Sequence, residues 1–435
     1  MTRTDRQILH IALPSIVSNI TVPLLGLIDV SIVGHLGAAS YIGAIAVGGM
    51  LFNMIYWLFG FLRMGTGGLT AQAYGRHDLQ EVTRILLRSL SISLLLALAL
   101  LILQYPVRSL AFMLMDASEE VRKLATLYFH ICIWGAPATL GLYSFSGWFI
   151  GMQNSRFPMF IAITQNIVNI VASLLFVFVF GMKVEGVALG TLIAQYAGLF
   201  MAYLLWLRYY RPLRKYISRK QLFTHDAMKR LFQVNRDIFL RTLCLVAVTV
   251  FFTSTGAAFG DVVLAVNTLL MQLFTLFSYI MDGFAYAGEA LTGKYIGAGN
   301  RQELQRTIRH LFGWGIALSL AFTLLYGIGG KEFLGLLTNE QSVISASGDY
   351  FYWVLAIPLA GFAAFLLDGI CIGAASTNIM LKAMVVASGS FFLIYYSLHN
   401  VLHNHALWLG FIVYLALRGI MQALLLNSSS LRTAR

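Results

Sequence analysis

Asp29 is one of the few ionisable side chains in this sequence that lie deep within an apolar run. The run Pro23-Leu-Leu-Gly-Leu-Ile-Asp29-Val has no basic residue one helical turn from the acid. An ionisable group inside a membrane span costs about 2.5–3.5 kcal/mol on insertion scales, so it is expected to have a function. Because burial disfavours the charged form of a carboxylic acid, we predict that Asp29 exchanges a proton near neutral pH. The alternative is a solvated acid near a helix end.

Polar side chains that could surround Asp29 recur at helical spacing on two later apolar segments. They are Gln165, Asn166, Asn169 and Ser173 on one segment, and Thr191 and Gln195 on the next. Residues four apart share one face of a helix. We therefore predict a cation-coupling site in which Asn169, Ser173 and Thr191 accompany Asp29.

The second half of the chain has a larger set of charges in apolar segments. Asp237 and Arg241 are four residues apart, the spacing of a helical ion pair. Asp282 and Glu289 are seven apart and share a helix face, and Asp368 stands alone in Leu367-Asp-Gly369. We predict that Arg241, Asp282, Glu289 and Asp368 are candidates for charges facing a cavity.

The remaining reactive residue types do not form a motif for catalysis or metal binding. His399, His403 and His405 have no clustered acid and are expected to form a polar connection. Cys132, Cys244 and Cys371 occur singly, so neither a disulfide nor a metal site is expected. We expect no cofactor other than a coupling ion, H⁺ or Na⁺, and no enzymatic activity.

The elements that must position these residues are membrane helices. The chain has 435 residues, of which 59% are hydrophobic and 11% charged, a balance that excludes a soluble globular protein. A span needs about 20 apolar residues. The sequence predicts helices over 8–33, 42–74, 84–106, 121–150, 157–181, 185–207, 229–254, 262–295, 305–328, 343–373, 379–399 and 405–427.

Basic residues concentrate in every second connection between these helices. Arg76 and Arg84 flank the second connection, and the sixth holds the run from Arg208 to Lys215. Basic residues resist translocation, so we predict that both termini are cytoplasmic and that the protein crosses the bacterial inner (plasma) membrane many times. The formal net charge of +12 is thereby explained without nucleic acid as a partner.

The sixth connection divides the sequence into two similar halves. The stretch from Tyr74 to Arg84 aligns with that from Ile296 to Arg306, and at the same offset Gly151 aligns with Gly373. Repeats of this kind are typical of transporters that alternate access to a central site. The predicted domains are an N-lobe (1–207, helices 1–6), a basic cytoplasmic linker (208–228), a C-lobe (229–427, helices 7–12) and a cytoplasmic tail (428–435).

With these residues in view, nearly the whole chain resembles the multidrug and toxic compound extrusion (MATE) family, especially its DinF-type branch. The resemblance rests on Leu27-Ile-Asp29-Val-Ser-Ile-Val-Gly34, Gly186-Val-Ala-Leu-Gly-Thr191, Val234-Asn-Arg-Asp-Ile-Phe-Leu-Arg-Thr242 and Asp282-Gly-Phe-Ala-Tyr-Ala-Gly-Glu289. It implies two six-helix bundles in a V-shaped arrangement around a central cavity. It also implies export of organic, often cationic and amphipathic compounds in exchange for H⁺ or Na⁺, with a monomer sufficing.

The resemblance also suggests a role for single residues. Asp29 matches the family's first-helix aspartate, while Asn169 and Thr191 match polar partners on the fifth and sixth helices. Ser173 stands where some relatives have an aspartate, and Cys244 lies near the place where others have a glutamate, although Asp368 matches an aspartate of the tenth helix. These losses weaken a Na⁺ site in either half and favour H⁺ coupling through Asp29.

Three alternatives remain open at this stage. The first is a Na⁺-coupled drug exporter. The second is a flippase for lipid-linked saccharides with the same two-lobe plan, which predicts a strongly cationic cavity, for which Arg63 and Arg241 are the candidates. The third is an intramembrane enzyme that uses the histidines or the pair Asp282 and Asp368.

Overall fold

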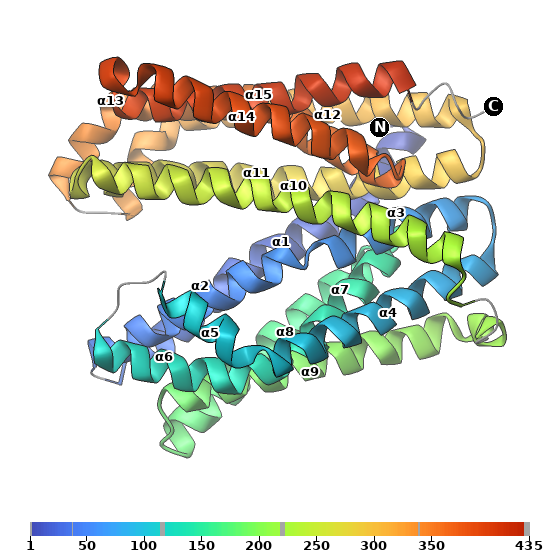
Figure 1. The fold of residues 1–435 in the computed structure, drawn as a ribbon, viewed down its shortest axis with the longest axis horizontal. Coiled ribbons are helices and arrows are strands. Elements are labelled where there is room, and N and C mark those ends of the chain that lie inside the picture. Colours follow the sequence, from blue (N-terminus) through green and yellow to red (C-terminus); the bar gives the residue numbers. More distant parts are fainter. Residues whose placement is uncertain (1, 37, 114–117, 218–221, 338–339, 430–435) are drawn as a thin grey trace. The chain divides into compact units, whose positions relative to one another are not determined.

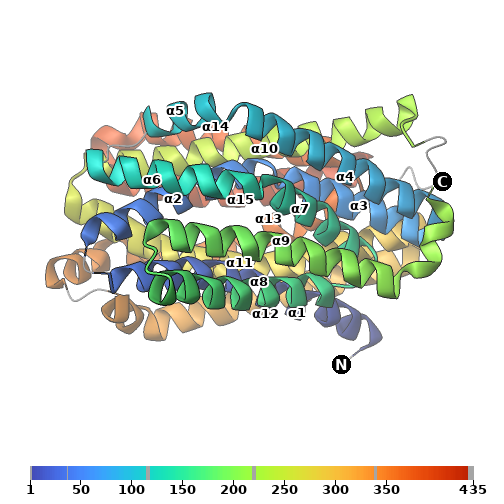
Figure 2. The same cartoon turned by 90° about the horizontal axis from the view of Figure 1, so that it is seen from below.

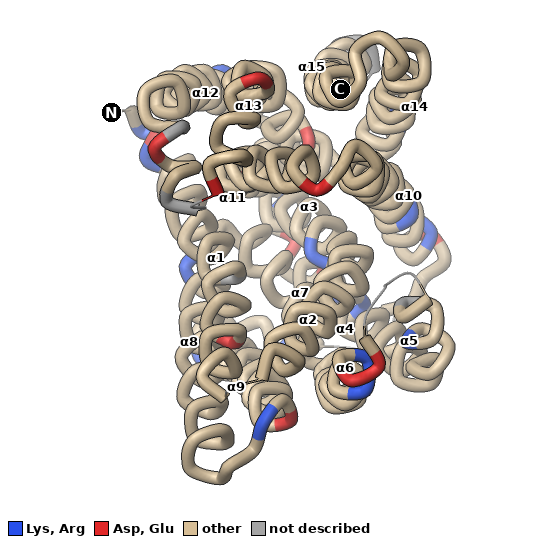
Figure 3. The backbone as a smooth tube through the Cα atoms, turned by 90° about the vertical axis from the view of Figure 1, so that its left-hand side faces the viewer, with Lys and Arg blue, Asp and Glu red and all other residues tan. Residues whose placement is uncertain are grey.

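The computed structural model is built from long helices throughout the part of the chain that it describes, residues 2–36, 38–113, 118–217, 222–337 and 340–429. Within these residues there is no strand, and twelve helical segments are long and apolar enough to cross a membrane. Charged residues are sparse along them (Figure 3). The prediction of an all-α polytopic protein with about twelve spans is confirmed. Parts of the predicted linker (218–221) and tail (430–435) lie outside the described residues.

The chain folds into two compact units, here called the N-unit (residues 13–229) and the C-unit (residues 1–12 and 230–435). The N-unit is coloured blue to green in Figure 1 and the C-unit mainly yellow-green to red. Apart from α1 (Arg3–Gly34), which contributes to both units, the N-unit contains α2 (Ala39–Leu58), α3 (Phe61–Gly75), α4 (Leu79–Ile102), α5 (Gln104–Met113), α6 (Glu119–Cys132), η1 (Ile133–Gly135), α7 (Ala136–Gly151), α8 (Arg156–Leu174), η2 (Leu175–Val179), α9 (Val184–Tyr209) and η3 (Arg211–Tyr216). The C-unit contains most of α10 (His225–Ala258), then α11 (Asp261–Gly297), α12 (Arg301–Leu337), α13 (Gln341–Gly373), α14 (Thr377–Leu402) and α15 (Asn404–Ser429).

The start of α1 packs in the C-unit and not in the half of the sequence to which it belongs. Asp5 accepts hydrogen bonds from His310 Nδ1 at 2.8 Å and from Trp314 Nε1 at 3.2 Å, both on α12. Gln7 accepts a hydrogen bond from Tyr295 of α11 at 2.8 Å. These polar contacts hold residues 1–12 in the C-unit, so the structure differs here from the predicted lobe boundary.

The two units repeat one another at the level of single atoms. A Cβ atom added to Gly147 of α7 would lie 2.1 Å from the carbonyl oxygen of Arg63 on α3. Its counterpart 222 positions later, Gly369 of α13, would place a Cβ 2.1 Å from the carbonyl oxygen of Ala285 on α11. Arg63 and Ala285 are also 222 positions apart. Each unit therefore brings an equivalent pair of helices, α3 with α7 and α11 with α13, into backbone contact at the equivalent point.

The same offset relates six of the seven described residues with positive φ, all except Gly260. These pairs are His77 and Gly299, Gln153 and Ala375, and Gly181 and His403. Helix caps repeat too, since Asp78 accepts a bond from the Glu81 amide at 2.9 Å and Asn300 from the Glu303 amide at 3.0 Å. The predicted pseudo-symmetry of two six-helix bundles is therefore confirmed in their turns and helix crossings.

We predict that Gly369→Ala destabilises the C-unit because its methyl group cannot fit against Ala285. Overpacking of this kind costs about 1–3 kcal/mol, which chemical denaturation of the detergent-solubilised protein would detect. Gly389→Ala on α14 is the matched control: its Cβ would meet nothing within 4 Å, and alanine favours a helix over glycine by up to about 1 kcal/mol. Equal stability of the two variants would contradict the close helix contact.

Three predicted helices are interrupted. The predicted helix 84–106 is divided at Leu103, where α4 ends at Ile102 and α5 begins at Gln104. The predicted helix 42–74 breaks between α2 and α3, where Phe59 and Gly60 form a tight turn with bonds from Leu62 N to Phe59 O and from Arg63 N to Gly60 O. The predicted helix 121–150 passes through the 3₁₀ turn η1 just before Pro137, which lacks the amide hydrogen that an unbroken helix would use.

Candidate functional site

Asp29 lies in the N-unit on the last third of α1, after its two prolines, Pro14 and Pro23, and the residue is 5% exposed. The Asn169 side chain on α8 and the Thr191 hydroxyl on α9 act on the carboxyl group, and both are neutral. Among the described residues, the Oδ1 atom of Asp29 has no hydrogen-bond partner. The acid is thus buried beside uncharged groups and has spare capacity to accept a hydrogen bond or hold a proton.

The partners of Asp29 form a small hydrogen-bonded cluster between α8 and α9. Asn169 donates to the Thr191 hydroxyl at 3.0 Å, and Ser173 donates to the Asn169 carbonyl oxygen at 3.4 Å. Asn169 and Ser173 are both fully buried. The structure therefore brings together the four residues that the sequence analysis placed in the coupling site.

Glycines on α9 allow α8 and α9 to pack closely enough for this cluster to form. A Cβ atom on Gly190 would lie 2.2 Å from Ser173 Oγ, and one on Gly198 would lie 2.6 Å from the Gln165 side chain. Both positions are eight residues apart on α9 and meet residues eight apart on α8. The two helices are consequently fixed in register, which sets Asn169 beside Thr191.

The other amides predicted to surround Asp29 have separate contacts. Asn166 donates to the Thr21 carbonyl oxygen of α1 at 3.1 Å, and Gln195 of α9 lies where Gly135 leaves room for it. Tyr128 and Cys132 of α6, both buried, are close enough to Asp29 to interact electrostatically with its carboxyl group. These α6 residues were missed by the sequence analysis because neither is unusual in an apolar segment.

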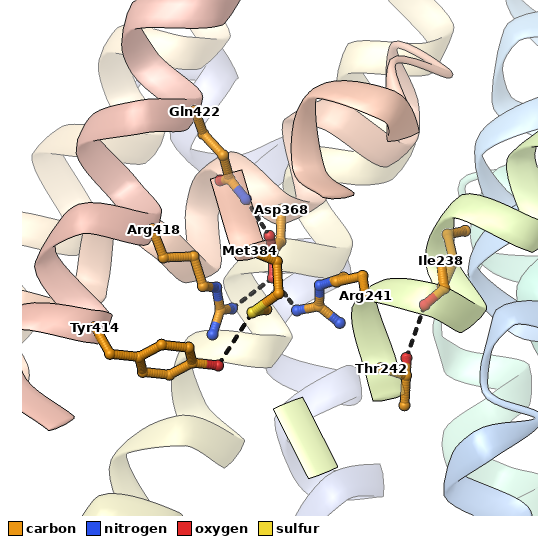
Figure 4. Close-up of polar contacts among 8 residues, drawn as sticks. All are labelled: Ile238, Arg241, Thr242, Asp368, Met384, Tyr414, Arg418 and Gln422. Atoms are coloured by element: carbon orange, nitrogen blue, oxygen red, sulfur yellow. Dashed lines mark hydrogen bonds and ion pairs between the residues drawn. The ribbon is translucent and has the colours of Figure 1, made fainter. Parts of the chain in front are cut away.

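A buried ion cluster in the C-unit is centred on Asp368 of α13 (Figure 4). Its Oδ2 atom accepts bonds from Arg241 of α10 and, at 2.5 Å, from Arg418 of α15. Its Oδ1 atom accepts a bond from Gln422 of α15 at 2.6 Å. All four residues are more than nine-tenths buried, and the Arg418 guanidinium lies 5.3 Å from the ring centroid of Phe365. Both carboxylate oxygens of Asp368 are therefore engaged by side chains of the C-unit.

This cluster corrects one expectation and adds two residues. The predicted pair of Asp237 and Arg241 is wrong: Asp237 pairs with Arg236 at 2.9 Å and accepts a bond from Thr377 at 3.2 Å. Arg418 and Gln422 were not singled out. An arginine with a glutamine one turn later in an apolar segment is the signal that could have found them.

The other candidate charges of the C-unit, Asp282 and Glu289, lie on α11. Asp282 is half-buried and acts electrostatically on Arg418, whereas Glu289 is fully buried. Both interact with further groups of the chain. His405 of α15, one of the three histidines considered for metal binding, accepts bonds from Tyr352 at 2.9 Å and Trp353 at 3.1 Å. That histidine joins an aromatic contact between α13 and α15.

Comparison with known proteins identifies the relatives of this chain. The family model described as MatE matches residues 14–175 and 238–396. DNA damage-inducible protein F of Escherichia coli is 39% identical over 97% of this chain and 92% of its own length. Protein DETOXIFICATION 44, chloroplastic, of Arabidopsis thaliana is 24% identical over 95% of this chain and 80% of its own length.

Solved structures share the fold over almost the whole chain. A crystal structure of MATE in the bent conformation gives a TM-score of 0.85 at 20% identity and covers 99% of this chain and 97% of that one. The Vibrio cholerae MATE transporter VcmN in the bent form also gives 0.85, at 16% identity, covering 99% and 98%. At such identities the likeness shows the fold, and Asp29 and its partners must be judged on their own geometry.

Proposed function

This chain belongs to the MatE family and is a multi-pass membrane transporter, and we propose that it is a proton-coupled antiporter that exports organic, often cationic or amphipathic, compounds by alternating access. The observation that carries the choice of ion is the surroundings of Asp29. Its carboxyl is buried next to the neutral side chains of Asn169 and Thr191. A buried acid without a fixed cation changes its charge by taking up a proton, and that change is the elementary step of a proton-coupled cycle.

Sodium fits these surroundings poorly. A hard cation in a protein is bound by about six oxygen ligands, usually including carboxylates. Asp29 supplies the one carboxylate of the cluster, and Ser173 adds a hydroxyl where a second acid would strengthen a sodium site. In the C-unit, Asp368 is already engaged by Arg241, Arg418 and Gln422. Proton coupling through Asp29 is therefore the simpler mechanism.

The names of relatives support the proposed direction of transport and the proposed class of substrate. A distant relative, 22% identical over 79% of this chain and 76% of its own length, is named probable multidrug resistance protein NorM of Photorhabdus laumondii. We propose an analogous export role at the inner membrane, with both termini in the cytoplasm, small organic molecules as substrates and the monomer as the working unit. No cofactor beyond the coupling ion and no enzymatic step is part of this proposal.

The proposal is tested by uptake of a fluorescent organic cation into everted vesicles that contain the native protein, with vesicles lacking it as the control. We expect dye to accumulate when the vesicle interior is acidified, because protons then leave as dye enters. A Na⁺ gradient with the higher concentration inside the vesicles, applied without a pH gradient, should give no accumulation. Accumulation driven by Na⁺ would replace the proton with sodium, and failure under both gradients would favour a flippase for lipid-linked saccharides.

A further inference from the structure

Two adjoining hollows lie along the first turns of α12 in the C-unit. One has a volume of about 410 Å³ and is lined by Asp5, Arg309, His310, Gly313, Trp314 and Ala317. The other has a volume of about 350 Å³ and is lined by Gln302, Gln305, Arg306, Arg309 and His310. Because Arg309 and His310 line both, the hollows form one continuous depression, here called the α12 groove. The start of α1 lies beside α12 at this place (Figure 2).

The α12 groove contains two arginines, one unpaired among the described residues and one with only a long, partly exposed ion pair. Arg309 is exposed and, within the described part of the chain, takes part in no hydrogen bond or ion pair. Arg306 is 3.8 Å from Glu303, with both side chains largely open to solvent. Two arginines on successive turns present donors that suit the oxygens of a phosphate group.

The one acid in the groove does not cancel this charge. Both oxygens of Asp5 are already engaged, Oδ1 by His310 and Trp314 and Oδ2 by the amide and hydroxyl of Thr2 at 2.8 Å. Asp5 therefore serves to hold α1 against α12. The arginines on the other side of His310 keep their hydrogen-bonding capacity for a ligand.

An apolar face continues from the groove along α12. Gly313 and Ala317 line the groove, and the residues that follow on the same face are exposed: Leu320 by 51%, Leu324 by 64% and Ile328 by 81%. From Arg309 to Ile328 the helix rises about 28 Å, close to the thickness of about 30 Å of a bilayer's hydrocarbon core. A ligand of the α12 groove would thus have an anionic head at the membrane surface and an apolar tail in the hydrocarbon.

We infer that the α12 groove binds an anionic glycerophospholipid. Arg306 and Arg309 hold its phosphate, the glycerol backbone lies over Gly313 beside the Trp314 ring, and one acyl chain follows Ala317, Leu320 and Leu324. Basic pockets at the cytoplasmic ends of membrane helices are suited to such headgroups, and tryptophan favours the interface. Since Asp5 lines the same groove, the bound lipid also covers the contact that holds the start of α1 to α12.

The inference is tested by native mass spectrometry of the full-length protein in detergent, titrated with phosphatidylglycerol or with phosphatidylcholine of the same acyl chains. We expect the first to bind and the second to bind much more weakly. In the double variant Arg306→Gln/Arg309→Gln, affinity for phosphatidylglycerol should fall roughly tenfold to thirtyfold, from the attraction of about two basic residues for an anionic lipid.

Two further variants distinguish specific lipid binding in the α12 groove from nonspecific electrostatic attraction of the lipid to the protein. Arg208→Gln/Arg211→Gln removes the same charge from exposed positions of the N-unit and should keep the affinity. Gly313→Leu leaves the charge unchanged but fills the groove, so it should weaken binding as well. Equal binding of the two lipids, an equal loss in the control, or undiminished binding in both groove variants would overturn the inference.

Discussion

Asp29→Asn is expected to reduce proton-driven accumulation of the substrate to the level of vesicles without the protein. Asparagine keeps the size of the side chain and can still bond to Asn169 and Thr191, but it cannot gain or lose a proton near neutral pH. Uptake of a fluorescent organic cation under an imposed pH gradient measures the effect. Stability should be unchanged or slightly raised, because the variant no longer buries an ionisable group.

The matched control is Asp261→Asn, which removes an exposed acid at the start of α11. It should transport at the native rate. If Asp29→Asn also accumulated dye at that rate, proton coupling through Asp29 would be wrong although export itself would stand. Asp29→Glu keeps an ionisable carboxyl and is expected to retain part of the activity, a result that a purely structural role for Asp29 does not predict.

Asp368→Asn is expected to give the largest loss of stability. It leaves the guanidinium groups of Arg241 and Arg418 buried without their anion, and removal of one member of a buried ion pair costs about 3–5 kcal/mol. Chemical denaturation in detergent and the amount of protein recovered from the membrane both report this loss. Glu119→Gln is the control, since Glu119 and its partner Lys123 are 85% and 76% exposed and such pairs contribute at most about 1 kcal/mol.

A rescue variant distinguishes the ion cluster from a general sensitivity of α13. The triple change Asp368→Leu/Arg241→Met/Arg418→Met removes all three charges together and should recover most of the stability lost in Asp368→Asn. Replacing a complete buried ion cluster by apolar side chains is often neutral or stabilising. If Asp368→Asn were as stable as Glu119→Gln, the cluster would contribute little to the fold.

Much of the fold could be predicted because each membrane helix is recognisable from its own stretch of sequence. Apolar runs of sufficient length indicate spans, and the alignment of Tyr74–Arg84 with Ile296–Arg306 predicts the repeat, which the structure reproduces down to the caps at Asp78 and Asn300. The breaks at Phe59 and at η1 could not be read from hydropathy. They depend on backbone hydrogen bonds that glycine and proline alter within an otherwise continuous apolar run.

The candidate site was partly predictable for the same reason. Asp29 and Asn169 stand out as polar residues in apolar surroundings, and their spacing indicates which face they share. The pairing of charged side chains between helices distant in sequence could not be predicted in this way. Arg241 has an acid one turn away, yet it pairs with Asp368, 127 residues later, because the packing of α10 against its neighbours decides which acid it reaches.

The division of α1 between the units has a consequence for how the chain can be cut into parts. Residues 1–12 belong to the C-unit, and residues 225–229, which open the corresponding helix α10 of the second repeat, belong to the N-unit. The boundaries of the compact units therefore do not coincide with the boundaries of the sequence repeats at either place. A chain severed in the linker would yield two fragments, neither of which contains all of its own unit.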